Sequence, residues 1–199
     1  MTAVASALAA PELPAEMAIH FDASGDPDGY VDRPLALASM PLLATGLVAL
    51  FAAIPRVDPL GENIAEFRGA YDALAVGTIA LLAYVHGLVL AYNLGTEFDV
   101  TVAVAPAVAA VYYLAGHLLS RAERNWFVGL RTPWTLSDER VWTRTHERVA
   151  PLFKLAGVVA LVGVVVPSLA IYLLVGPVAV AALAGTVYSY VCYRRLHAA

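Results

Sequence analysis

The run LAGVVALVGVVVPSLAIYLL, Leu155–Leu174, decides the fold class of this chain. It holds twenty residues, and none of them carries a charge. A transmembrane helix needs about 20 predominantly apolar residues to cross a hydrocarbon core of ~30 Å. Backbone polar groups within lipid must be satisfied inside the segment itself, which favours a helix. We therefore expect this run to cross a membrane as an α-helix.

Other apolar runs of similar length predict that the chain spans the membrane five times. Only Val175 and Gly176 separate the last run from Leu155–Leu174, which predicts a tight helical hairpin. The sequence is 60% hydrophobic and 14% charged, far from the averages of soluble domains. We expect an all-α polytopic membrane protein with five full transmembrane helices. The four further runs are Leu35–Ile54, Tyr71–Tyr92, Val100–Leu119 and Pro177–Tyr193.

The first ten residues, Met1–Ala10, are apolar but too few to span a membrane, because a helix of this length extends only about 15 Å. We interpret them as a truncated first helix; a short interfacial segment is the alternative.

The predicted organisation of the chain has four parts. Residues 1–34 hold a short apolar segment and a polar loop, and residues 35–119 hold three transmembrane helices. Residues 120–154 hold a cytoplasmic loop with an amphipathic helix, and residues 155–199 hold a transmembrane hairpin and a basic C-terminus.

The basic residues divide unevenly between the two sides of the predicted membrane. Arg33 lies alone on one side, whereas eleven of the twelve Lys and Arg residues lie on the other. Basic loops are retained in the cytoplasm. We therefore expect the 120–154 loop and the C-terminus to be cytoplasmic in a multi-pass protein of the cell membrane. The eleven are Arg56, Arg68, Arg121, Arg124, Arg131, Arg140, Arg144, Arg148, Lys154, Arg194 and Arg195.

The stretch HFDASGDPDGY, His20–Tyr30, then lies outside the cell. An EF-hand alignment with Gly29 at position 6 places Leu35 where the bidentate acid is required, so we predict no metal site. An ion near Asp26 and Asp28 stays an alternative. We expect a turn shaped by glycine and proline that presents polar side chains to a partner. The candidate functional residues here are His20, Asp22, Gly25, Asp26, Asp28 and Tyr30.

The loop Arg121–Lys154 combines a turn with a predicted amphipathic helix. Pro133 disfavours a helical conformation at Thr132, and Ser137 is a suitable N-cap residue. Trp142 lies on the apolar face of the helix that follows, opposite a basic face that suits anionic lipids. The helix is interpreted either as a docking surface for a cytoplasmic partner or as a connector that lies on the membrane.

Aromatic side chains bracket Arg131 in the stretch NWFVGLRTPW, which precedes this helix. An arginine among aromatic rings can bind a phosphate headgroup or stack on a ring. The candidate functional residues of the loop are Asn125, Trp126, Gly129, Arg131, Thr132, Pro133, Trp134, Ser137, Trp142 and His146.

Two ionisable residues within the spans, Asp72 and His86, are candidates because such groups are costly in a membrane. Asp72 is expected at a helix N-terminus, where a carboxylate is favoured. A neighbouring hydroxyl is expected to satisfy His86. A functional role for both would indicate a small transporter or membrane enzyme. The small residues Ala181, Gly185 and Ser189 predict close helix packing, either internal or between subunits, so an oligomer or an assembly subunit is a third alternative.

Two stretches together carry a resemblance to a known family. LPAEMAIHFDASGDPDGY, Leu13–Tyr30, and RNWFVGLRTPWTLSDERVWTRTHERVAPLF, Arg124–Phe153, resemble the SdpI family of membrane proteins and the extracytoplasmic module that often accompanies it. The resemblance implies an immunity protein that resists a secreted membrane-active peptide toxin, with a cytoplasmic repressor as a second partner beside membrane lipids. It implies no catalytic residue, no cofactor and no direct contact with nucleic acid.

Overall fold

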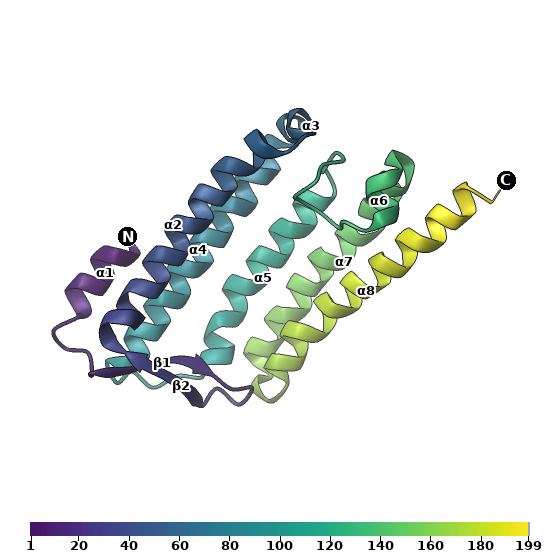
Figure 1. Cartoon of the computed structure of the whole chain (residues 1–199). Coiled ribbons are helices and arrows are strands. Elements are labelled where there is room, and N and C mark those ends of the chain that lie inside the picture. Colours follow the sequence, from purple (N-terminus) through teal and green to yellow (C-terminus); the bar gives the residue numbers. More distant parts are fainter. Residues whose placement is uncertain (199) are drawn as a thin grey trace.

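Five long helices form the protein, described here for residues 1–198 of a computed structural model (Figure 1). Each is long and apolar enough to cross a membrane. The predicted class, an all-α polytopic membrane protein, is thereby confirmed. The helices are α2 (Arg33–Val57), α4 (Arg68–Asn93), α5 (Val100–Leu119), α7 (Glu139–Val165) and α8 (Ala170–Leu196).

Short elements cap both ends of the helix bundle (Figure 1). One end, which we call the hairpin end, holds the strands β1 (Glu16–Phe21) and β2 (Pro27–Asp32) and the 3-10 turn η1 (Pro167–Leu169). The other, the loop end, holds α3 (Gly61–Glu66), α6 (Pro133–Ser137) and the C-terminal end of α8. The helix α1 (Thr2–Ala9) packs against α2 and α4.

The connection between the last two spans differs from the prediction. The helix α7 ends at Val165, and Val166 takes a non-helical conformation with φ −129° and ψ 74°. Proline at position 167 explains this end, because it disfavours helix at the preceding residue. The expected helix Leu155–Leu174 is therefore wrong, because the chain turns inside this run. The predicted turn at Val175 and Gly176 is wrong as well, since both residues lie inside α8.

The predicted amphipathic helix is real, but it is continuous with the fourth span. A single helix, α7, runs from Glu139 to Val165. Its apolar face, with Val141, Trp142 and Val149, is buried within the protein. The interpretation of this segment as a helix that lies on the membrane is therefore wrong, because these side chains pack against α5 and the 120–138 loop instead.

Residues 16–32 form an antiparallel β-hairpin, which the sequence analysis did not foresee. Asn93 of α4 anchors it, because its side chain accepts from the Ala18 N–H and donates to the Ala18 carbonyl, both at 2.9 Å. In the turn, Asp22 Oδ1 accepts from the N–H groups of Ser24 and Asp26. Gly25 takes φ +87°, a conformation that glycine adopts without steric cost.

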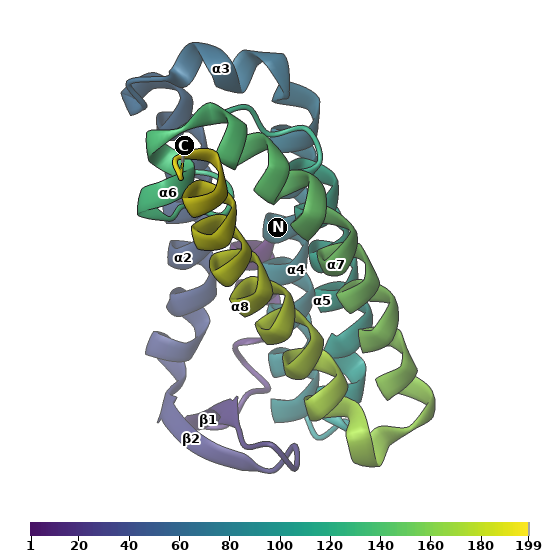
Figure 2. The same cartoon turned by 90° about the vertical axis from the view of Figure 1, so that its right-hand side faces the viewer.

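Small residues bring α5, α7 and α8 into close contact (Figure 1, Figure 2). A Cβ added at Gly157 of α7 would lie 2.6 Å from the Ala109 carbonyl of α5. One added at Gly185 of α8 would lie 2.5 Å from Val149. The stripe of small residues predicted on α8 therefore packs inside the protein. By contrast, an apolar groove of about 920 Å³ separates parts of α1, α2 and α4.

Candidate functional site

The 120–138 loop is held in a defined shape by the side chain of Asn125, which is fully buried. Its Nδ2 donates to the carbonyls of Glu123 (2.9 Å) and Val128 (3.0 Å). Its Oδ1 accepts from the N–H groups of Phe127 (3.0 Å) and Val128 (2.6 Å). All four hydrogen bonds of this amide are made to backbone groups of the loop, so the role of Asn125 is to stabilise the shape of the loop.

A stacked pair of rings supports the next part of the loop. Trp142 and His146 stack with ring centroids 4.1 Å apart, and Trp142 Nε1 donates to the Ala122 carbonyl. The Leu130 N–H donates to His146 Nε2 at 3.0 Å. Because Nε2 accepts, the imidazole proton resides on Nδ1, which donates to the Trp142 carbonyl at 2.8 Å. The loop backbone passes over these two rings at Gly129, which has a φ of +110°.

Threonine side chains at the N-terminal end of α6 connect the loop to α8. Thr132 and Thr135 form a capping box, and Thr132 is extended, as Pro133 predicted. The Thr132 hydroxyl also lies 3.0 Å from the Ser189 hydroxyl of α8. All three hydroxyl residues are buried. A rigid polar contact therefore couples the loop to the last helix.

Two polar residues that the sequence analysis missed fasten the loop to the connection between α2 and α4. Asp58, which is buried, accepts from the Trp126 N–H through Oδ2 at 2.9 Å. Asn63 Nδ2 donates to the Arg124 carbonyl at 2.7 Å. No pattern marks either residue, because their partners are backbone groups more than sixty positions away in the chain.

Asp138, and not the predicted Ser137, caps α7. Its Oδ1 accepts from the Arg140 N–H at 2.7 Å, while Oδ2 pairs with the Arg140 guanidinium at 2.9 Å. The hydrogen bond from Arg140 lowers the pKa of the Asp138 carboxyl from 3.8 to about 2. The ring of His197 lies 3.4 Å from the same carboxylate, so the C-terminal end of α8 also meets this cap.

The remaining motif residues lie at the surface of the loop end. Trp126 is 50% exposed and Phe127 39% exposed. Arg131 is also exposed, and its Nη1 donates to the Trp126 carbonyl at 2.8 Å. Trp134 packs on Tyr190 of α8, with ring centroids 5.0 Å apart. Exposed aromatic rings beside a guanidinium form a surface suited to an anionic or peptide partner. Pro133 and Ser137 are exposed as well.

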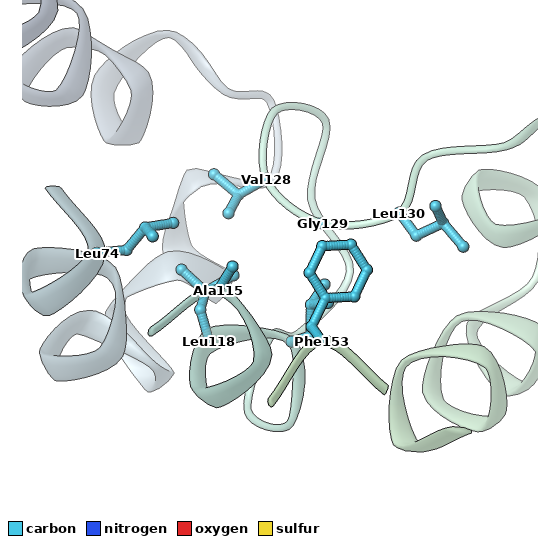
Figure 3. A pocket seen from close by; sticks show the side chains of 8 residues that line it. Leu74, Ala115, Leu118, Val128, Gly129, Leu130 and Phe153 are labelled. Carbon is cyan, nitrogen blue, oxygen red and sulfur yellow. The ribbon is translucent and has the colours of Figure 1, made fainter. Parts of the chain in front are cut away.

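Beneath the loop lies an apolar pocket of about 190 Å³ (Figure 3). Val128, Gly129 and Leu130 of the loop cover it, and side chains of α4, α5 and α7 form its floor. Its lining carries only hydrocarbon side chains, so it supplies no group for catalysis. The lining residues on the helices are Leu74, Ala115, Leu118, Leu119 and Phe153.

At the hairpin end, the external motif forms an exposed polar face. His20 Nδ1 lies 2.5 Å from Asp28 Oδ1, with the two side chains 72% and 49% exposed. Tyr30 is 57% exposed on the adjoining strand. The structure thus brings the predicted His20 and Asp28 together, with Tyr30 exposed two residues after Asp28 on β2, whereas Asp22 bonds to the turn backbone. Within residues 1–198, no three metal-ligating side chains converge.

The two intramembrane candidates lie apart on α4. Asp72 follows the first turn of the helix and pairs with Arg68 at 2.8 Å, where both side chains are about half exposed. His86 is buried, and its Nε2 lies 2.9 Å from the Ser6 hydroxyl, the kind of partner predicted for it. Fourteen residues of helix place Asp72 and His86 about 21 Å apart, too far for one site.

Comparisons with known proteins match the two motif regions. The SdpI/YfhL protein family matches residues 121–189, and a domain of unknown function (DUF1648) matches residues 1–45. The chain is similar to the Immunity protein SdpI of Bacillus subtilis (strain 168), with 26% identity over 187 residues. That alignment covers 93% of this chain and 87% of the relative. No solved structure matches. The two matched regions contain the hairpin at one end and the loop at the other.

Proposed function

We propose that this chain belongs to the SdpI family and is an immunity protein of the cell membrane that protects its host from a secreted, membrane-active peptide toxin. The observation that carries the proposal is the similarity to an immunity protein along 93% of the chain, which includes both polar motifs. In the proposed orientation the hairpin end is outside and the loop end is cytoplasmic, because Arg33 is the basic residue of the hairpin end while the loop end is rich in arginine.

The hairpin is the proposed meeting point with the toxin. It presents His20, Asp28 and Tyr30 on the outer side of the bundle, where a peptide arrives before it enters the membrane. The hairpin is also anchored to α4 by Asn93, so contact with its strands acts directly on a membrane-spanning helix.

The loop end is the proposed docking surface for a cytoplasmic protein, and a transcriptional repressor is the candidate partner. Trp126, Phe127 and Arg131 form its exposed part. The Trp126 and Phe127 N–H groups donate to Asp58 and Asn125, and the Arg131 side chain donates to the Trp126 carbonyl, so this part of the loop is already ordered and little conformational entropy is lost when a partner binds. Rigid aromatic and arginine side chains of this kind dominate the binding energy of protein interfaces.

The test is survival and membrane potential of sensitive cells that express the wild type, His20→Ala or Arg131→Ala, challenged with membrane-permeabilising peptides secreted by related strains. We expect the wild type to protect and both variants to lose protection. Matched controls are Glu16→Ala on the same strand as His20 and Arg144→Ala at the loop end, both exposed. Equal membrane insertion of all variants must be established by quantifying the protein in membrane fractions.

The outcomes separate the function from the site. If the wild type protects against none of the peptides, the proposed immunity function fails. If His20→Ala and Arg131→Ala protect as well as their controls, the function stands and the assignment of the hairpin and the loop surface fails.

A further inference from the structure

Three basic side chains gather where α5 and α7 meet, on the side of the loop end. His117 lies in the last turn of α5, Arg121 follows this helix, and Lys154 lies on α7. Arg121 Nη1 is 2.9 Å from both ring nitrogens of His117. Lys154 is also close enough for its charge to act on this ring. We call these three residues the cationic cluster.

Lys154 reaches the cluster from the membrane-spanning part of α7. The eleven positions from Lys154 to Val165 correspond to about 17 Å of helix, so its backbone lies well inside the span. Side chains of a helix tilt toward its N-terminus, which for α7 is at the loop end (Figure 1). The Lys154 side chain passes Gly116 of α5, where an added Cβ would lie 2.7 Å from Lys154 Cγ. Its ammonium group is therefore directed toward the other two basic residues.

The cluster lacks a carboxylate partner in the described part of the chain. Within residues 1–198, neither Arg121 nor Lys154 forms an ion pair, whereas Arg68 at the same end of the bundle is paired with Asp72. The His117 ring accepts from Arg121 and supplies no negative charge. A cation at the edge of the hydrocarbon region is costly unless an anion compensates it. An anion from outside the chain would therefore be stabilised here.

Apolar residues flank the cluster on its membrane side. Tyr113 lies four positions before His117 on α5, and Val158 lies four positions after Lys154 on α7, so each shares a helix face with a basic residue. Both are exposed on the surface of the bundle, at 52% and 56%. The helices touch at this level, because a Cβ added at Gly157 would lie 3.3 Å from the Tyr113 nitrogen. Basic groups toward the loop end and apolar groups deeper in the span match a molecule with an anionic head and apolar tails.

We propose that the cationic cluster binds the phosphate of an anionic phospholipid, whose acyl chains lie along Tyr113 and Val158. A zwitterionic lipid suits the site less, because its own ammonium group would meet Arg121 and Lys154. A free phosphate ion has no tails for the apolar residues, and an acidic protein segment would have to enter the membrane to reach Lys154. The site is independent of the proposed immunity function, because its residues belong neither to the hairpin nor to the proposed docking surface.

The test measures lipid binding to the purified full chain in detergent by native mass spectrometry. Phosphatidylglycerol is compared with phosphatidylcholine that carries the same acyl chains. For the wild type we expect phosphatidylglycerol to bind about tenfold more tightly. In Lys154→Gln this preference should fall about fivefold, because one basic residue near a membrane surface contributes roughly that factor. Lys154→Arg keeps the charge and should keep most of the preference.

Arg68→Gln is the matched control, because it removes one charge at the same end of the bundle from a residue that Asp72 already neutralises. Its preference for phosphatidylglycerol should stay close to that of the wild type. Equal binding of phosphatidylcholine by all variants shows that their lipid-facing surface is intact. An equal fall of the preference in Lys154→Gln and Arg68→Gln would indicate general attraction to a basic surface and overturn the proposal. A wild type without any preference would overturn it as well.

Two competitors, added at constant ionic strength, identify the source of the anion. Inorganic phosphate and a glutamate-rich peptide should both leave phosphatidylglycerol bound to the wild type, because neither offers tails to the apolar residues beside the cluster. Displacement by inorganic phosphate would indicate a phosphate site without a lipid. Displacement by the peptide would indicate an acidic protein segment as the occupant. Either result would overturn the assignment to a phospholipid.

Discussion

At the scale of single residues, Gly129 shows how tightly the loop is fitted to α7. Its φ of +110° is strained for any side chain, and an added Cβ would lie 2.6 Å from His146 Nε2. That nitrogen accepts the Leu130 N–H, so a methyl group at position 129 would also displace a backbone hydrogen bond. Gly129 therefore combines a conformational requirement with a packing requirement.

We predict that Gly129→Ala lowers the free energy of unfolding by about 2–4 kcal/mol, from positive φ and overpacking together. The control is Gly95→Ala, at φ +89° with no atom within 4 Å of the added Cβ, which should lose only about 1 kcal/mol. Thermal unfolding in detergent measures both. Equal losses would show that the contact with His146 contributes nothing.

Asp138 carries a prediction about acid. Its folded pKa of about 2 lies below its ordinary value of 3.8, so its contribution to stability is present above that value and is lost as the pH falls towards 2. The melting temperature of the wild type should therefore fall between about pH 5 and pH 2 more steeply than that of Asp138→Asn, which keeps a capping side chain. Parallel curves for the two proteins would contradict this.

At the scale of elements, proline has opposite effects in different helices. Pro167 ends α7, whereas Pro177 lies within α8 without ending it. Hydrophobicity and length predicted the number of spans correctly but could not decide which proline marks the turn, so the expected span Leu155–Leu174 contains it. The hairpin at residues 16–32 was not predicted either. The side chain of Asn93, which binds its edge at Ala18, is 75 positions away in the sequence, so no local pattern indicates this contact.

The candidate site was predictable only in part. The local signals at Pro133 and Thr132 indicated the turn correctly, because capping and proline effects act over a few residues. The sequence did not reveal that Asn125, Trp142 and His146 are buried supports and that Trp126 and Arg131 form the surface. Burial depends on the contacts with α5, α8 and the segment after α2, which no local pattern encodes.

For the α5–α7 interface, we predict that Gly157→Val lowers the free energy of unfolding by about 1–3 kcal/mol, because its side chain must displace the Ala109 backbone. Gly176→Val is the control, since this exposed position in α8 has no atom within 4 Å of an added Cβ. Thermal unfolding again gives the comparison. A control as destabilised as Gly157→Val would attribute the loss to helix propensity alone.

For the hairpin, we predict that Asn93→Ala increases amide hydrogen exchange in residues 16–32 by at least tenfold, because both backbone groups of Ala18 lose their partners. Exchange in α7 should stay as in the wild type, which serves as the internal control. Unchanged protection of the hairpin would mean that the contacts of Met17 and Leu13 alone hold it on the helices.

At the scale of the whole molecule, the proposed orientation makes a direct prediction. In a Cys192→Ala background, Ser24→Cys in the hairpin turn should react with a membrane-impermeant maleimide in intact cells. Ser137→Cys at the loop end should react only after the cells are permeabilised. Both serines are exposed and Cys192 is buried, so access is set by the membrane. The reverse pattern would invert the topology and exclude the hairpin as the outer face.

The close contacts of α8 bear on the order in which the protein is made. The hairpin needs only α4 for its Asn93 anchor, so the N-terminal half has its partners early in synthesis. The loop end is completed later. The contacts of Thr132 with Ser189 and of Leu130 with Gly185 form only after the last helix has left the ribosome. Until then, the Thr132 hydroxyl lacks its partner on α8. Quality-control proteases that recognise unfinished membrane proteins would thus meet an incomplete loop end in every chain truncated before α8.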